Sequence, residues 1–287
     1  MPENHTEIRK LELGEFPEAL LEIPEPPKEL FIRGSLPNKD TVLLAVVGSR
    51  KYTSYGKEAC ENIIGGLSGY DITIVSGLAL GIDSIAHKAA LQSGLKTIAV
   101  PGSGLDPKVL YPRTNLRLSD EIVKSGGALL SEFRSDFKAT VWSFPQRNRI
   151  MAGLSKAVLV VEASDKSGTL ITARLALDYN RDVYAIPSSI FSHGAKGSNR
   201  LIKGGATPIT SSEDLLDALG FDISKKKETS ISANDDETKV LDLLAEPLSK
   251  DDLLNKMNMP TNEANILLSI MEIKGLIKES LGSVHKT

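Results

Sequence analysis

Several short stretches of the chain combine glycine, hydroxyl and cationic side chains in a way that suits the binding of an anion. The residues in question are Gly48, Ser49, Arg50, Ser76, Gly77, Gly81, Arg113, Phe144, Arg147, Asn148, Arg149, Ser167, Gly168, Thr169 and Asn199. Glycine lets a backbone approach a ligand closely, and free amides at a helix N-terminus favour negative charge. The chemistry that these residues predict is the binding of phosphate groups.

The stretch "SFPQRNRIMAGLSKAVLVVEASDKSGTLITARLAL", residues 143–177, carries two of these features. Arg147 and Arg149 are two positions apart, about 200° around a helix axis. One is therefore expected to face a ligand, while the other supports the fold or grips a neighbouring phosphate. Phe144 stands before them, where its ring could stack on a base. The turn at 167–169 then offers a hydroxyl and amides at the start of another helix.

The sequence does not contain the residues that common catalytic or metal sites require. Cys60 is the single cysteine and there are four histidines, so neither a disulfide framework nor a zinc site is expected. Neither G-x-G-x-x-G nor G-x-x-x-x-G-K-[ST] occurs. His87 is expected to be a buried, hydrogen-bonded histidine, since no nucleophile stands beside it. We predict no catalytic residue, no metal and no cofactor.

The elements that must position these residues follow from the apolar pattern. Short, β-branched apolar runs that suit buried parallel strands occur at Val42–Val47, Ile72–Ser76, Thr97–Val100, Ala128–Ser131, Ala157–Val161, Val183–Ile186 and Thr207–Ile209. Amphipathic segments with helix caps lie between them, and Asp83 is the expected cap of one. This alternation predicts an α/β fold with a doubly wound, mostly parallel Rossmann-like sheet. Most of the anion-binding turns then fall at the carboxyl ends of its strands.

Composition divides the chain into four parts. Residues 1–40 are rich in proline and glutamate and predict an extended arm with one short helix at Phe16–Leu21. Residues 41–220 form the Rossmann-like domain, and 221–238 lack apolar periodicity and predict a linker. Residues 239–287 show three short amphipathic helices and a turn into a strand-like tail. They predict a small winged-helix domain.

Charge and hydropathy limit the classes of protein that the chain can represent. The net charge is −3, which argues against a protein that coats nucleic acid with its whole surface. Residues 41–220 hold 20 Lys and Arg against 16 Asp and Glu, so a polyanion is expected to meet this segment locally. No apolar run approaches the roughly 20 residues that span a bilayer. The charged N-terminus lacks a signal peptide, which predicts a cytoplasmic protein.

Six motifs in order resemble one known family. They are "VVGSR", "IVSGLALGID…AH", "PGSGLD…YP", "FPQRNRIMAGLS", "VVEA…SGTLITARLAL…RDVYAIP" and "G.NRLIKGGA". Together they cover about residues 28–220 and are similar to the DprA/Smf family of DNA-processing proteins. The resemblance implies a Rossmann-like homodimer that binds single-stranded DNA without base specificity. It also implies the loading of RecA recombinase onto that DNA during natural transformation.

The resemblance also implies which residues bind DNA. The family's Gly-Ser-Arg turn matches Gly48, Ser49 and Arg50, and its basic residue after Tyr-Pro matches Arg113. The Phe-Pro-x-Arg-Asn-Arg segment matches 144–149. The expected protein is therefore a binding protein for single-stranded DNA, with no catalytic step.

Two other functions remain open from the residues. A nucleotide-processing enzyme similar to the phosphoribohydrolases would use the same sheet edge, although "PGSGLD" stands where those enzymes carry "PGGxGT" and a following glutamate. A transcription factor would read duplex DNA with the helix at about Thr261–Ile273. That helix carries Glu263 and Glu272 and no Lys or Arg, which is a poor face for phosphates. It favours contact with a protein partner or a role in a dimer instead.

Overall fold

The computed structural model describes residues 7–192, 194, 196–222, 235–244, 248–257, 259–273, 275–280 and 283–286. The chain divides into two compact units, residues 1–227 and 228–287. Each unit has its own buried apolar core. Within the described residues no helix combines the length and the apolarity needed to cross a membrane.

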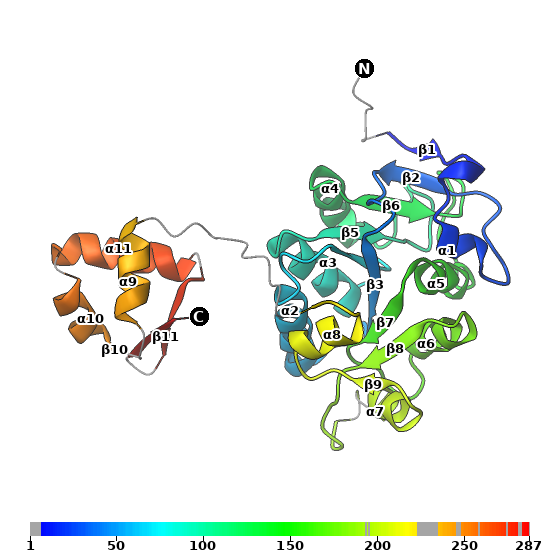
Figure 1. Ribbon diagram of the computed structural model, residues 1–287. Coiled ribbons are helices and arrows are strands. Elements are labelled where there is room, and N and C mark those ends of the chain that lie inside the picture. The colour runs from blue at the N-terminus through cyan, green and yellow to red at the C-terminus, as the bar shows by residue number, and fades with distance from the viewer. Residues whose placement is uncertain are drawn as a thin grey trace. The chain divides into compact units, whose positions relative to one another are not determined.

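The first unit is built on a nine-stranded sheet, counted over the described residues (Figure 1). Its strands are β1 (Arg9–Lys10), β2 (Phe31–Gly34), β3 (Val42–Val47), β4 (Ile72–Ser76), β5 (Lys96–Ala99), β6 (Ala128–Ser131), β7 (Ala157–Val160), β8 (Asp182–Ala185) and β9 (Thr207–Pro208). Their spatial order is β1-β2-β6-β5-β4-β3-β7-β8-β9. The pairs from β6 to β9 are parallel, as the sequence predicted. The order reverses between β3 and β7, which is where doubly wound folds bind ligands.

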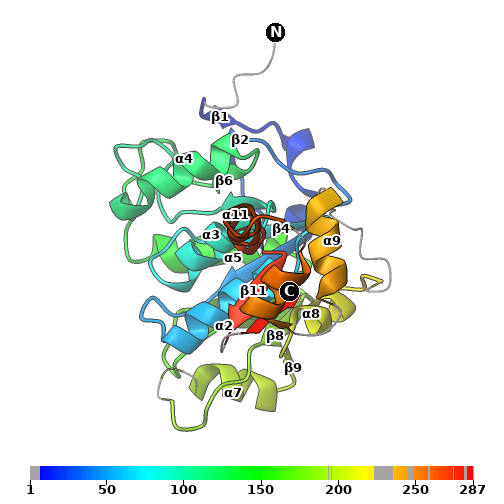
Figure 2. The ribbon, with the colours of Figure 1, turned by 90° about the vertical axis from the view of Figure 1, so that its left-hand side faces the viewer.

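Helices cover both faces of this sheet. One face carries α1 (Glu18–Leu21), α5 (Ser143–Leu154), α6 (Thr169–Asp178) and α7 (Lys196–Lys203), and the other carries α2 (Ser54–Gly65), α3 (Ile82–Gln92), α4 (Leu116–Lys124) and α8 (Ser212–Ala218). Helices α2 and α3 pack side by side (Figure 2). Strand β3 is apolar throughout because both of its faces are covered. Ala45 and Val47 face the α5 side, while Leu44 and Val46 face the α2 side.

The N-terminal arm contributes two strands to the sheet, which the sequence did not predict. Residues 9–10 and 31–34 form β1 and β2, and β2 pairs antiparallel with β6, with Phe31 opposite Ser131. Leu30 and Ile32 are buried there. Strands of two and four residues are too short to show an alternation of apolar and polar side chains, so the sequence alone does not predict them. They form because β2 pairs with β6, which is distant in the sequence. The short helix is present as α1.

The second unit contains α9 (Asp235–Leu243), β10 (Leu248–Ser249), α10 (Lys250–Lys256), α11 (Thr261–Ile273), β11 (Ile277–Ser280) and β12 (Ser283–Lys286). The three strands form an antiparallel sheet in the order β10-β12-β11. The predicted linker at 221–238 lies mostly outside the described residues, and α9 begins inside its range. A winged-helix domain stays a prediction, with which this order of helices and hairpin agrees.

Candidate functional site

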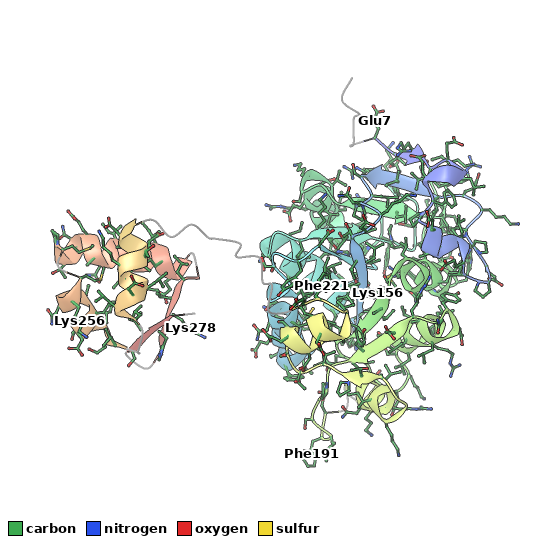
Figure 3. All side chains as sticks on the ribbon, in the orientation of Figure 1. Glu7, Lys156, Phe191, Phe221, Lys256 and Lys278 are labelled. Carbon is green, nitrogen blue, oxygen red and sulfur yellow. The ribbon has the colours of Figure 1, made fainter. Side chains whose placement is uncertain are left out.

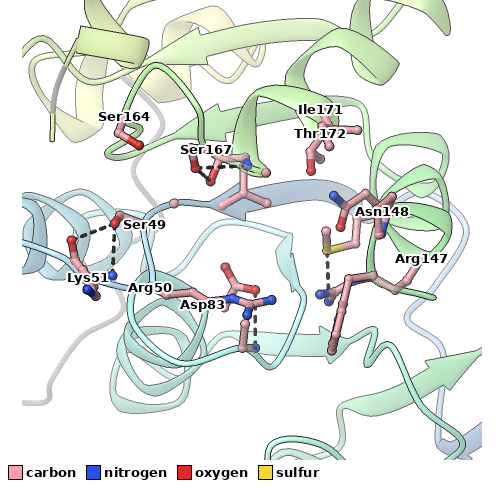
Figure 4. A pocket seen from close by; sticks show the side chains of 18 of the residues that line it. Ser49, Arg50, Lys51, Asp83, Arg147, Asn148, Ser164, Ser167, Ile171 and Thr172 are labelled. Carbon is pink, nitrogen blue, oxygen red and sulfur yellow. Dashed lines mark hydrogen bonds between the residues drawn. The ribbon is translucent and has the colours of Figure 1, made fainter. Parts of the chain in front are cut away.

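A pocket of about 560 Å³ opens at the carboxyl ends of β3 and β7, beside the point where the strand order reverses. The predicted residues that line it are Gly48, Ser49, Arg50, Phe144, Arg147, Asn148, Ser167, Gly168 and Thr169. Figure 4 shows Arg50 and Asp83 on one side, with Ser167 and Thr172 across from them. Gly77 lines a small adjoining pocket that shares Arg50, Phe144 and Arg147. The fold therefore brings together residues from four separate stretches of sequence, 48–50, 77–83, 144–148 and 167–172.

The turn after β3 presents backbone and cations to the pocket. The Ser49 hydroxyl donates to the Lys51 carbonyl at 2.7 Å and accepts from the Lys51 amide at 3.1 Å. This side chain therefore holds the turn closed. Arg50 and Lys51 are exposed at the pocket wall, where their positive charges remain available to an anion.

Two buried groups of opposite charge, Asp83 and Arg147, line the pocket. Arg147 is 4% exposed, and its Nη1 donates to the Val100 carbonyl. The Asp83 carboxylate accepts from the Gly77 amide at 3.1 Å and the Ala79 amide at 3.4 Å. Burial raises the pKa of Asp83, an effect that Arg147 opposes, and burial lowers the pKa of Arg147 to about 10. Arg147 thus stays charged at neutral pH and places a positive charge at the pocket wall.

Residue 77 must be a glycine because the Arg147 and Asp83 side chains lie against its backbone. A Cβ on Gly77 would lie 1.8 Å from Arg147 Nη1 and 2.5 Å from Asp83 Oδ2. Gly81 is required for a different reason, since its φ of +84° at the N-cap of α3 favours glycine. Asp83 lies inside the first turn of α3 and is not its cap, contrary to the sequence prediction. Its carboxylate instead holds the preceding loop.

Phe144 lies between two exposed side chains at the rim. The Arg50 guanidinium carbon is 5.2 Å from the Phe144 ring centroid, and the Tyr111 ring centroid is 5.6 Å away. The ring also packs against Gly102, where an added Cβ would lie 2.6 Å from Phe144 Cδ1. Phe144 is half-buried, so an aromatic face and a cation are held together at the pocket mouth.

The turn after β7 forms the opposite wall. The Ser167 hydroxyl accepts from the Thr169 amide at 3.2 Å and donates to Thr169 Oγ1 at 2.9 Å. Gly168 is exposed at the N-cap of α6. Helix α6 has ten residues, and the positive end of its dipole points at the pocket. The sequence predicted a second anion cradle at this turn, and the turn does line the pocket.

Five predicted residues line neither this pocket nor the small adjoining one. Ser76 is buried and donates to the Val46 carbonyl at 2.6 Å, and Gly81 forms the cap described above. Arg113 is exposed in η2 (Arg113–Asn115), next to Pro112 of the small pocket. Arg149 pairs with Glu132 and donates to the Glu25 carbonyl. Asn199 bonds both backbone groups of Ser188 and fixes the loop after β8.

The pocket also contains residues that the sequence did not single out. Asp83 and Lys51 line it, as does Ser164 after β7. The position of Lys51 next to Arg50 could have predicted that it lines the pocket. No pattern in the sequence near Asp83 predicts that it lies close to Arg147. The loop after β8 reaches the same edge: Tyr55 Oη donates to the Pro187 carbonyl at 2.6 Å, and Phe191 projects from its tip (Figure 3).

His87 is a buried, hydrogen-bonded histidine, as expected, and Cys60 is buried too. His87 Nδ1 lies 2.7 Å from Thr97 Oγ1, which itself donates to the Ile74 carbonyl. Burial lowers the pKa of His87 to about 3, and the charge of Arg147 acts in the same direction. Burial raises the pKa of the Cys60 thiol to about 12. Across the described residues, no group of three or more His, Cys, Asp or Glu side chains could hold a metal ion.

Residues 8–220, which contain every part of this pocket, match the family described as DNA recombination-mediator protein A. The chain belongs to this family. Among its relatives, Protein Smf of Escherichia coli is 45% identical over 206 residues, which is 72% of this chain and 54% of that protein. The DNA processing protein DprA of Streptococcus pneumoniae is 45% identical over 206 residues, 72% of each chain. The chain thus spans about half the length of the E. coli relative.

Solved structures of the DNA recombination-mediator protein A family share the fold. The X-ray structure of DprA from S. pneumoniae has a TM-score of 0.68 at 42% identity and covers 76% of each chain. A Helicobacter pylori structure, described as giving insight into the single-stranded DNA binding mode of its DNA processing protein A, has a TM-score of 0.66 at 32% identity. It covers 75% of this chain and 96% of that one.

Proposed function

We propose that the pocket after β3 and β7 binds the backbone of single-stranded DNA without base specificity. The observation that carries this proposal is the arrangement of Arg50 over the Phe144 ring, beside two turns rich in backbone amides. Amides and guanidinium groups suit phosphates, and an aromatic face suits any base. The family and the DNA-binding description of the H. pylori relative support the same ligand.

The pocket favours binding over nucleotide hydrolysis. Asp83 is the acidic residue among those that line it, and its carboxylate is buried and bonded to backbone amides. A carboxylate held in this way cannot easily reach a substrate as a general base. The charged lining residues are otherwise cations: Arg50, Lys51 and Arg147. We therefore propose no catalytic step.

The wider role is proposed from the family. DNA recombination mediators act on DNA before strand exchange, so we propose that this chain loads RecA on single-stranded DNA during natural transformation. A homodimer would lengthen the DNA path by repeating the pocket. The mass of the protein in solution tests the dimer, and the rate of RecA filament formation on single strands with and without the protein tests the loading.

Binding itself is tested with labelled oligo-dT and a duplex of equal length, by fluorescence anisotropy over a series of salt concentrations. We expect the single strand to bind more tightly, and its affinity to fall as salt rises because bound counterions are released. Phe144→Ala should weaken binding about 5- to 100-fold through lost stacking, equally for dT and dA strands. Equal affinity for single strand and duplex, with no effect of Phe144→Ala, would refute the proposal.

A further inference from the structure

A second aromatic cluster lies at the same edge of the sheet, after β6. We call Phe133, Phe137 and Trp142 the aromatic shelf. The Phe133 and Phe137 rings are stacked, with centroids 4.5 Å apart and 17° between planes. The Trp142 ring meets both edge-on, at centroid distances of 5.8 and 5.6 Å. These contacts hold the indole in one orientation.

The indole is nevertheless largely open. Trp142 is 55% exposed and the preceding Val141 is 89% exposed. Burying an aromatic ring is favourable, so a tryptophan that packs on two rings and still presents half its surface to solvent is available to a ligand. Trp142 is not among the residues that line the pocket, so the pocket does not explain its exposure.

The surroundings of the aromatic shelf indicate what that ligand is. Arg134 and Lys138 are exposed on the same loop, and Asp136 is its one exposed acidic residue. An oriented aromatic ring beside a local excess of cations suits a stacked base with its phosphate. A protein partner would be favoured by a broader apolar surface without cations.

The aromatic shelf is also continuous with the pocket. Trp142 is the N-cap of α5, and Phe144 of the pocket lies two residues later. Phe144 packs on Gly102 after β5, and Phe133 follows β6, which is the neighbouring strand. Neighbouring strands are about 5 Å apart. A chain that lies over Phe144 therefore needs to continue along the rim by only about one strand spacing to reach the shelf.

We propose that Trp142 stacks on a base of single-stranded DNA that leaves the pocket toward β6. This inference rests on the proposed function, and it adds a second stacking position and the direction of the DNA path. The strand then runs from the turns after β7 and β3, past Arg50 and Phe144, to the aromatic shelf.

The chain offers a direct probe, because Trp142 is its single tryptophan. The full-length protein is titrated with unlabelled oligo-dT while the tryptophan emission is recorded, and binding is followed in parallel by anisotropy of labelled oligo-dT. We expect a strand of about 16 nucleotides to quench the emission in step with binding. A strand of about 4 nucleotides, held in the pocket, should quench it much less.

Substitutions separate stacking from folding. Trp142→Ala should weaken binding of the longer strand about 5- to 100-fold and of the shorter strand less, whereas Trp142→Phe should restore most of the affinity. Leu177→Ala, which removes another exposed apolar side chain, on α6, is the matched control and should bind as the wild type does. Circular dichroism melts establish that each variant is folded.

Three results would overturn the inference. If the longer strand binds but leaves the Trp142 emission unchanged, and Trp142→Ala binds normally, the path does not cross the shelf while the proposed function stands. If the emission instead changes on dilution of the protein without DNA, the shelf is a contact between copies of this chain. If no strand binds at all, both the inference and the proposed function fail.

Discussion

Two pockets of similar size lie at opposite ends of the same two strands. The pocket at the carboxyl ends of β3 and β7 has about 560 Å³, and the pocket at their amino ends, beneath the N-terminal arm, has about 540 Å³. The first is lined by three cations and one acid. The second holds three cations and three acids: Lys39, Lys156, Arg181, Glu15, Glu18 and Asp40. Size alone therefore does not distinguish them, whereas charge does.

The two pockets differ further in whether their cations are already hydrogen-bonded to the protein. At the amino ends, the Lys156 ammonium donates to the Leu219 carbonyl, and Arg181 donates to the carbonyls of Ala19 and Gly153. Helix α5 also directs its C-terminal end there, since Leu154 lines that pocket. At the carboxyl ends, α6 directs its N-terminal end at the pocket. Parallel βα units orient helix dipoles in this way, and only one edge of the sheet becomes suited to anions.

The largest expected effect concerns the buried cation at the carboxyl edge. Arg147→Met leaves the Asp83 carboxylate buried without its neighbouring charge, so the free energy of unfolding should fall by about 3–5 kcal/mol. Arg181→Met at the amino edge removes hydrogen bonds to carbonyls and should cost about 1–2 kcal/mol. Urea unfolding of the full chain, followed by Trp142 emission, measures both. Equal losses for the two variants would show that the edges do not differ in this respect.

The next effect is a dependence of stability on pH. The pKa of His87 is about 3 in the folded protein against 6.5 as its ordinary value, so the unfolded chain binds the proton first as pH falls. Stability is present above about 6.5 and is lost on acidification toward 3, by up to about 1.4 kcal/mol per pH unit. His87 lines neither pocket, so this effect reports on the core between α3 and the sheet.

His87→Gln should remove this slope in urea unfolding between about pH 6.5 and 4.5. The raised pKa of Asp83 acts in the opposite direction, since protonation then favours the folded state just above its ordinary value of 3.8. The difference between wild type and variant isolates the histidine, because Asp83 is present in both. A variant as sensitive to acid as the wild type would refute the assignment.

The smallest effect is the most direct test of the charge difference. Arg50→Ala should weaken binding to oligo-dT about tenfold for all sequences and lower the salt slope by about one unit. Lys39→Ala removes a cation that is 87% exposed at the amino edge and should leave affinity unchanged. Anisotropy titrations at several salt concentrations give both quantities. Similar losses for the two variants would mean that the whole surface, and not one pocket, attracts the strand.

Local pattern was enough to predict the strands from β3 to β9 and the glycine turns that follow them. A buried parallel strand must be apolar on both faces, and a turn at its carboxyl end needs glycine and hydroxyl groups, so both leave a signal within a few residues. The prediction that Gly48, Phe144 and Ser167 meet at one edge followed from that sheet alone. The structure confirms this convergence.

Tertiary contacts decided what each side chain does. The sequence could not decide which of Arg147 and Arg149 faces a ligand. In the structure Arg147 lines the pocket near Asp83, whereas Arg149 pairs with Glu132. Strand β2, residues 31–34, forms because β6, residues 128–131, lies beside it. The physical reason is that burial and charge pairing depend on neighbours distant in sequence, whereas strand and turn preferences depend on neighbours within a few residues.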